Sequence, residues 1–252
     1  MKLLVTVAHP DDEAFGCGSV LAHASAAGAE SVVACATRGE LGELAPGLSH
    51  VAPPPDQLGA IREAELRSAA QLLGVARVEM LGWRDSGVDG EPAAGSLCAA
   101  SAADVEEVIA AVLERERPDV VVTLDASDGH RDHVVVRDAT LAAVARTPAP
   151  PAEVYLWCLP RSLMRAFTGS AQLGTPDEEI TTVVDTSAHL ERRWAAMRAH
   201  RSQVPPYDHM PPELQAAFLT ADRLRRVHPP WAGGRVGAGW LGSASMGASR
   251  RF

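Results

Sequence analysis

The stretch LLVTVAHPDDE, residues 3–13, joins an apolar run to a histidine, a proline and three successive carboxylates. Its first six residues, 3–8, read as a strand buried on both faces, which is typical of the centre of a parallel sheet. Residues 13–28 then show helical apolar spacing and end at Gly28, a helix stop signal. The stretch therefore predicts a buried strand that leads into a cluster of like charges. A bound cation would offset their mutual repulsion.

Strands and helices alternate along the rest of the chain. Further strands are predicted at 31–37, 77–81, 119–124, 154–159 and 181–184, and helices at 57–73, 102–116, 132–145 and 188–201. This order is typical of a Rossmann-like, three-layer α/β fold with a mostly parallel sheet. The last 25 residues are rich in Gly, Ser and Arg, and we expect them to be irregular.

The composition argues against a nucleic-acid-binding protein and against a membrane protein. The chain has 252 residues, a formal net charge of −9 and one lysine, which argues against a nucleic-acid partner held through its phosphates. No stretch approaches the roughly 18 apolar residues of a membrane helix, so we expect no membrane insertion. The four cysteines form no CxxC pair, which predicts reduced thiols in a cytoplasmic protein. Homo-oligomer formation is left open.

Four polar segments follow predicted strands: HPDDE (9–13), TRGELGE (37–43), WRDSG (83–87) and DGHRDH (128–133). In open parallel sheets, ligands bind beyond the carboxyl ends of the strands, so we expect these segments to converge.

His9, Asp12 and His133 together offer two imidazoles and one carboxylate, a three-ligand set for a divalent metal. The structural alternative is that Asp11 or Asp12 caps the helix and that Glu13 is only a first-turn acid. That alternative leaves His9 and the HRDH segment unexplained, so we favour the metal site.

AHPDDE (8–13) and HRDH (130–133) together resemble the two signature motifs of the PIG-L/LmbE family of zinc-dependent N-deacetylases. The similarity continues in order over about the first 205 residues, through TRGELGE (37–43), IREAELRSAAQLLGV (61–75), LGWRDSG (81–87), PDVVVTLD (118–125) and HRSQ (200–203). The resemblance implies an LmbE-like catalytic domain over 1–204. It also implies a C-terminal extension over 205–252 that packs near the mouth of the active site without being independent.

The resemblance further implies hydrolysis of an acetamide, with an N-acetylglucosamine conjugate as the leading substrate. His9, Asp12 and His133 would bind Zn2+, with Fe2+ as the other metal to consider, and Asp11 would be the general base. Zinc lowers the pKa of bound water to ~7, so a carboxylate can take its proton at neutral pH.

His130 would polarise the amide carbonyl and stabilise the oxyanion, or donate a proton, and Asp132 would orient His130 and hold its charge. Two alternatives remain: His130 as a fourth or replacement metal ligand, and Asp132 as a simple first-turn helix acid.

Substrate contacts are implied by similarity to the mycothiol-pathway deacetylases of this family, at Glu43, Arg62 and Asp85. Weaker candidates are Arg38, Trp83 and His200. Each has a plain alternative: a solvated loop charge, an ion pair within a helix, a turn residue, or packing. The segment before His130 lacks the Gly-Gly-Tyr-Gly insertion of that subgroup, so the exact substrate, the pathway and the physiological metal stay open.

Two other functions compete with this one. The same ligands form the facial triad of non-haem iron oxygenases, although HxxD at a strand-to-helix turn suits that class poorly. A non-catalytic metal- or nucleotide-binding module is the other, but no GxGxxG follows the first strand.

Overall fold

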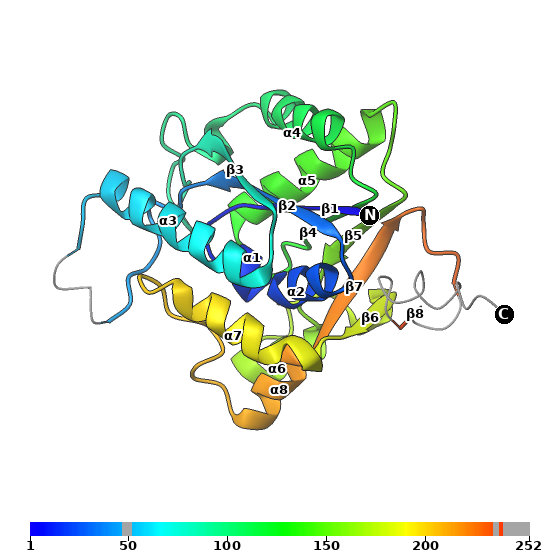
Figure 1. Cartoon of the computed structure of the whole chain (residues 1–252). Coiled ribbons are helices and arrows are strands. Elements are labelled where there is room, and N and C mark those ends of the chain that lie inside the picture. The colour runs from blue at the N-terminus through cyan, green and yellow to red at the C-terminus, as the bar shows by residue number, and fades with distance from the viewer. Residues whose placement is uncertain (47–51, 234–236, 239–252) are drawn as a thin grey trace, which may run out of the picture.

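The computed structural model describes residues 1–46, 52–233 and 237–238 (Figure 1). They contain one eight-stranded sheet in the order β3-β2-β1-β4-β5-β7-β6-β8. The strands are β1 Lys2–Val7, β2 Glu30–Thr37, β3 Arg77–Trp83, β4 Val120–Leu124, β5 Glu153–Trp157, β6 Thr182–Asp185, β7 Ala221–His228 and β8 Gly237–Ala238. Neighbours from β3 to β5 are parallel, whereas β7 is antiparallel to β5 and β6. The predicted mostly parallel α/β fold is confirmed.

Helices cover both faces of the sheet. They are α1 Asp12–Phe15, α2 Gly18–Ala26, α3 Pro55–Leu73, α4 Ala102–Glu116, α5 Arg131–Arg146, α6 Arg161–Thr168, α7 Leu190–Ala199 and α8 Pro212–Leu219. Helices α2, α3 and α7 lie on one face and α4 and α5 on the other (Figure 1). Successive residues of β1 supply the two cores in turn, Leu3 and Val5 to the first and Leu4 to the second. The result is three layers.

The point where the strand order reverses fixes the position of the site. β1 pairs with β2 on one side and with β4 on the other, and the chain fills the sheet outward in both directions. Beyond the carboxyl ends of β1 and β4, the segments 8–11 and 125–130 therefore face each other. In open α/β sheets this is the place where ligands bind.

The helix predicted at 13–28 is interrupted at Gly16 and Cys17, between α1 and α2. A side chain at Gly16 would collide with the Asp12 carbonyl oxygen and with Leu124, so the chain passes too close to β4 for any other residue. The interruption frees the carbonyl groups at the end of α1. Arg193 of α7 donates hydrogen bonds to the carbonyls of Ala14 and Gly16 and so replaces the missing helical partners.

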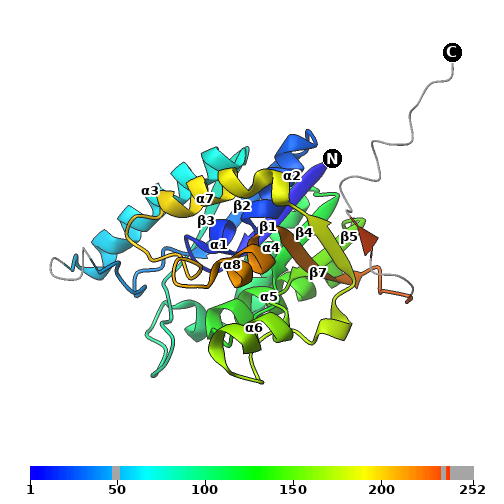
Figure 2. The same ribbon diagram turned by 90° about the horizontal axis from the view of Figure 1, so that it is seen from below.

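Strand β7, which lies inside the sheet between β5 and β6, is not predicted from the sequence. Its sequence ADRLRRVH carries three arginines and an aspartate, which hide the apolar alternation on which a strand prediction depends. Helices α6 and α8 are not predicted either, and they contact each other at the end of the molecule that lies at the bottom of Figure 1 and faces the viewer in Figure 2. Most of the tail expected to be irregular, and part of the predicted loop 38–57, fall outside the described residues.

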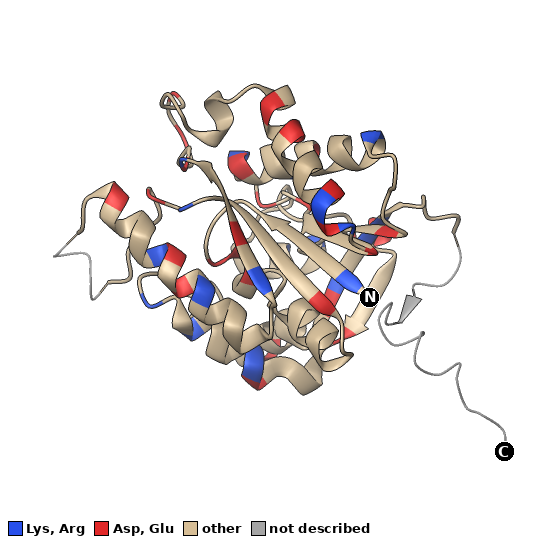
Figure 3. Cartoon of the chain, turned by 45° about the horizontal axis from the view of Figure 1, so that its top comes forward, with Lys and Arg blue, Asp and Glu red and all other residues tan. Residues whose placement is uncertain are grey.

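Acidic and basic residues are interspersed along the outer helices of the described part of the chain (Figure 3). Within that part of the chain, none of the helices is long and apolar enough to cross a membrane.

Candidate active site

Asp12 opens α1 and is held by the backbone before it. Its Oδ2 accepts hydrogen bonds from the N–H groups of Ala8 (3.1 Å) and His9 (2.8 Å). Its other oxygen, Oδ1, lies 3.3 Å from Nε2 of His133, and His9 Nδ1 lies 3.7 Å from Oδ2. The three predicted metal ligands, His9, Asp12 and His133, are therefore brought together from β1, α1 and α5.

Each ligand histidine is oriented by a carboxylate on its other ring nitrogen. His133 Nδ1 lies 2.7 Å from Asp128 Oδ2, and His9 Nε2 lies 3.2 Å from Asp132 Oδ2. A carboxylate accepts here, so each imidazole carries a proton on that nitrogen, and the other nitrogen, which faces Asp12, can bind a metal once it is deprotonated. This carboxylate–histidine arrangement is typical of metal-binding histidines.

The Nε2 atom of His133 gives an independent test of metal fit. It is buried and has no hydrogen-bond partner among the described residues. A buried polar atom without a partner is costly, and a cation would satisfy it. Two imidazoles and a carboxylate suit Zn2+ and also Fe2+. The residues fit a divalent metal.

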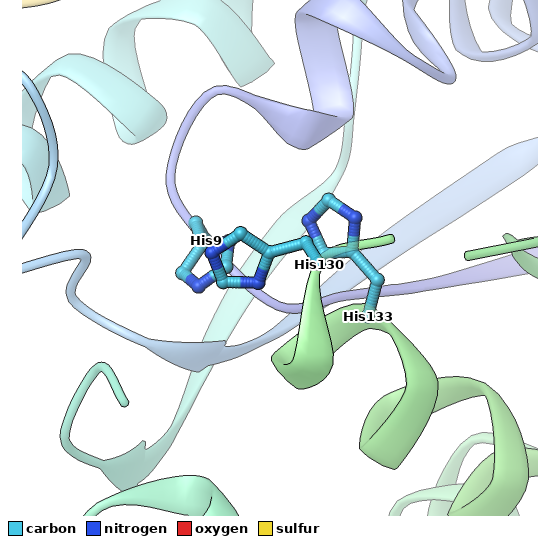
Figure 4. Close-up of side chains that lie close together, drawn as sticks. All are labelled: His9, His130 and His133. Atoms are coloured by element: carbon cyan, nitrogen blue, oxygen red, sulfur yellow. The ribbon is translucent and has the colours of Figure 1, made fainter. Parts of the chain in front are cut away.

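His130 lies beside both ligand histidines (Figure 4). Its ring centroid is 4.6 Å from that of His9 and 4.9 Å from that of His133. His130 precedes α5, and its Nδ1 accepts a hydrogen bond from the backbone N–H of Asp132 at 3.2 Å. Burial, and then the neighbouring His9 and His133, lower the pKa of His130. The alternative of His130 as a further ligand is compatible with these distances.

The carboxylate of Asp132 differs from expectation. It was predicted to orient His130, but it accepts hydrogen bonds from His9, from the N–H of Ser86 at 3.0 Å and from the thiol of Cys98 at 3.1 Å. Asp132 is the second residue of α5 and its side chain is fully buried, turned toward the loop after β3. Only its backbone N–H holds His130.

Electrostatics in the cluster follow from burial and proximity. Burial would raise the pKa of Asp12, but His133 and His9 hold it well below its usual range. Burial would lower the pKa of His133, but Asp12 and Asp128 raise it well above its ordinary value. The carboxylates thus favour a proton on His133, and a divalent cation would compete with that proton for the ring nitrogen.

Asp11 has an unusual backbone conformation, with φ at 119°. A non-glycine residue in this region costs on the order of 1–3 kcal/mol and persists only where its surroundings impose it. Here the N–H of Asp11 donates to Glu13 Oε2 at 2.9 Å, and its Oδ2 accepts from Arg62 at 2.8 Å. Burial raises the pKa of Asp11 to about 6, with Asp12 adding to the increase and Arg62 opposing it.

Arg62, a predicted substrate contact, lies against Asp11 and the backbone of the site. Its guanidinium is buried and donates to the carbonyls of Pro10 and Gly39, both at 2.6 Å, as well as to Asp11. Gly39 has a positive φ, and a Cβ there would collide with the guanidinium. Contact with substrate stays a prediction, whereas contact with Asp11 is observed.

His200 is also fully buried. Its Nε2 lies 2.6 Å from Glu13 Oε1, and neither side chain is exposed. Burial would lower the pKa of His200, but Glu13 raises it. His200 thus supports Glu13, which in turn holds the backbone of Asp11.

The other predicted substrate residues lie in three different surroundings. Asp85 is buried, with Oδ1 3.7 Å from His9 Nε2, so it borders the cluster. Glu43 and Arg38 are exposed, and Arg38 pairs with Glu63 at 2.9 Å. Trp83 is half-buried and packs against the second core.

Two residues of the site are not predicted from the sequence: Asp128, and Glu13 beyond its place as a first-turn helix acid. Asp128 lies within the quoted segment DGHRDH, five residues before His133, and that spacing at the entry to a helix was the available signal. Glu13 ends the HPDDE motif, but nothing local to it indicates a partner 187 residues away.

A family model described as GlcNAc-PI de-N-acetylase (PIG-L) matches residues 4–144, which hold both motifs. A 1D-myo-inositol 2-acetamido-2-deoxy-alpha-D-glucopyranoside deacetylase of Geodermatophilus obscurus is 37% identical over 243 residues. That match covers 81% of this chain and 83% of the relative.

Solved structures agree on the fold. The N,N'-diacetylchitobiose deacetylase of Pyrococcus horikoshii has a TM-score of 0.66 at 22% identity, covering 89% of this chain and 83% of that one. A 4-carboxy-2-hydroxymuconate hydratase of Pseudomonas putida has a TM-score of 0.64 at 19% identity, covering 92% and 98%. Because a deacetylase and a hydratase share the fold, the fold does not select the reaction.

The reaction class follows instead from the family match and from the relative that is 37% identical over most of the chain. The chain is a hydrolytic N-deacetylase and belongs to the family of GlcNAc-PI de-N-acetylases (PIG-L).

Proposed function

We propose that the chain removes the acetyl group from a small N-acetylglucosamine-containing conjugate, with zinc held by His9, Asp12 and His133. The observation that carries the metal site is Nε2 of His133, which is buried, makes no hydrogen bond within the described part of the chain and faces the Asp12 carboxylate at 3.3 Å. The substrate class is supported by the relative of Geodermatophilus obscurus, whose name specifies an acetamido sugar on inositol. Iron(II) suits the same ligands and is the alternative metal.

When bound, the metal polarises a carbonyl and lowers the pKa of a water toward ~7. Asp11 is the general base. Arg62 occupies its Oδ2, which leaves Oδ1 to accept the proton of the attacking water. The imposed backbone at Asp11, fixed by Glu13, aims this carboxylate. General base catalysis by a positioned side chain typically contributes 10²–10⁴-fold.

His130 stabilises the negative charge that develops on the carbonyl oxygen. Its Nδ1 accepts from the Asp132 N–H, so the neutral ring carries its proton on Nε2 and donates from there. One such donor is worth ~3 kcal/mol of transition-state stabilisation. The carbon–nitrogen bond then breaks, Asp11 returns its proton to the nitrogen, and acetate and a free amine leave.

Sugar hydroxyls are expected on the side of the cluster where Asp85 lies, 3.7 Å from His9. Its two carboxylate oxygens accept from the N–H groups of Gly87 and Leu41, which fix the side chain in place. Glu43 and Arg38 remain predicted contacts from the exposed loop after β2.

The test combines metal analysis with amine release. Purified protein is assayed for bound metal and, with fluorescamine, for amine released from a panel of N-acetylated sugars, as wild type and as Asp11→Asn. We expect near-stoichiometric metal in both and a 10²–10⁴-fold slower turnover in the variant. Asp138→Asn, an exposed position on α5, is the matched control and should behave as wild type.

Three outcomes would contradict the proposal. A protein that stays metal-free after reconstitution would exclude the metal site. Metal without amine release from any conjugate would favour a binding module. Oxygen consumption with iron bound would favour an oxygenase.

A further inference from the structure

An apolar cavity of about 280 Å³ adjoins the metal site. It lies between the ends of β4 and β5, α1, α6 and α8. We call this space the apolar cavity. Its lining includes Phe15, Trp157, Leu159, Met164, Met210 and Phe218. The mechanism described above uses none of these side chains.

The polar ends of the aromatic residues are turned out of the cavity. Trp157 donates its indole N–H to Asp222 at 3.0 Å, and Tyr207, also on the wall, donates its hydroxyl to the carbonyl of Phe15 at 2.7 Å. Only ring faces and aliphatic groups therefore meet a ligand from this side. Such a surface selects an apolar group and offers no hydrogen bonds to a sugar.

The cavity is continuous with the metal ligands. Asp12 and His133 form part of its wall, together with Asp128, which orients His133. A group bound there is therefore attached to, or next to, the atoms that the metal would hold. A ligand unrelated to the reaction would not need to bind against residues that hold the metal.

The opposite side of the cluster is polar. His9 faces Asp85 and Asp132 there, and Ser86 and the buried Glu40 complete the hydrogen bonding. An amide placed with its carbonyl at the metal has an amine half and an acyl half. If the hydroxyl-bearing amine half lies on the polar side, the acyl half enters the apolar cavity.

The cavity is much larger than an acetyl group needs. Its 280 Å³ is nearly twice the roughly 150 Å³ of an apolar cavity that holds a benzene molecule, whereas an acetyl group brings only one methyl group. If the bound acyl group is only an acetyl group, most of this apolar wall contacts water during the reaction. An alkyl chain of several carbons would cover it.

We propose that the apolar cavity binds the alkyl part of the acyl group, so that this enzyme accepts, and favours, N-acyl conjugates with straight-chain acyl groups longer than acetyl. This inference rests on the proposed function, because it assumes the same metal, base and amide. Each buried methylene should raise kcat/KM up to about fourfold.

The test uses N-acetyl-, N-butyryl-, N-hexanoyl- and N-octanoyl-glucosamine, which all release the same amine. We expect kcat/KM to rise at least tenfold from acetyl to hexanoyl. Leu159→Trp, which fills the cavity, should lower the hexanoyl-to-acetyl ratio at least tenfold. Ala166→Trp, at an exposed position on α6 outside the lining, is the matched control and should leave the ratio unchanged.

A second measurement does not depend on turnover. Octanoate should bind the zinc-loaded protein at least tenfold more tightly than acetate in calorimetry, with a negative heat-capacity change, and Leu159→Trp should remove the difference. Equal affinity for the two acids would overturn the inference even if all four amides are hydrolysed.

The failures are distinguishable. Turnover of the acetyl compound with no gain along the series overturns this inference and leaves the proposed function standing. A gain from an octyl group on the anomeric oxygen, with none along the acyl series, would assign the cavity to the other end of the substrate and overturn it too. Metal binding without turnover of any amide overturns the proposed function and this inference together.

Discussion

Replacing Arg193 measures how much the buried polar network around the site contributes to the free energy of unfolding. The Arg193 side chain is fully buried on α7. It donates to the carbonyls of Ala14 and Gly16 and to the hydroxyl of Ser19, at 3.3, 3.0 and 3.0 Å, and lies 3.4 Å from the Asp222 carboxylate. Arg193→Met keeps most of the apolar stem and removes every donor.

The expected loss of stability follows from the polar groups that Arg193→Met leaves without a partner. Removing one partner of a buried ion pair costs about 3–5 kcal/mol, because the other charge stays buried without compensation. The carbonyls at the end of α1 also lose their partner, so we expect the free energy of unfolding to fall by about 4 kcal/mol or more. In a domain of this size, that corresponds to a decrease in Tm of roughly 8–16 °C.

Urea denaturation followed by circular dichroism measures this change at fixed metal concentration. Arg198→Met, an exposed position on the same helix, is the control and should stay within about 0.5 kcal/mol of wild type. Asp222→Asn added to Arg193→Met should recover part of the loss, because it removes the orphaned charge. A stability for Arg193→Met within about 1 kcal/mol of wild type would refute this account of the network.

Three further predictions concern the site and the pH dependence of stability. Asp128→Asn should weaken zinc binding about 10–100-fold in a chelator competition, because the His133 ring loses its carboxylate partner, whereas Asp138→Asn should not. Glu13→Ala should lower kcat roughly tenfold to a hundredfold at nearly constant KM, because it releases the backbone of the general base, while Glu13→Gln keeps an acceptor and most of the activity. Burial raises the pKa of Asp125, so the folded chain holds that proton more tightly than the unfolded chain and stability falls as pH rises above about 4. Asp125→Asn should therefore raise Tm at pH 7, and the gain should disappear toward pH 4.

Each of these has a contrary result. Unchanged zinc affinity in Asp128→Asn would remove that residue from the metal site. Equal kcat for the alanine and glutamine variants at Glu13 would exclude a positioning role. A Tm gain in Asp125→Asn that is the same at pH 4 and pH 7 would show that ionisation is not its cause.

The sequence predicts this fold wherever the signal is local. The run before His9 is apolar without alternation, as a central parallel strand requires, and α4 begins and ends at the residues expected. The family resemblance rests on two short motifs whose side chains converge because both follow strands that lie next to each other, β1 and β4.

What the sequence did not predict depends on contacts between distant segments. The interruption after α1 is stabilised by Arg193, far along the chain, and β7 is a strand because β5 and β6 pair with it on both sides. The partner of the Asp132 carboxylate could not be read from spacing either. Residues 130 and 132 are close in sequence, but rotation along the first turn of α5 sends the carboxylate toward His9.

The imposed backbone at Asp11 has a consequence for anyone who selects variants of this enzyme for thermal resistance. A glycine adopts a φ of 119° at no steric cost, so Asp11→Gly relieves backbone strain on the order of 1–3 kcal/mol. It also takes the carboxylate away from the buried Arg62 guanidinium, and removing one partner of a buried ion pair costs about 3–5 kcal/mol. A screen that rewards folding alone therefore keeps the aspartate, so selection for robustness and selection for turnover retain the same residue at this position.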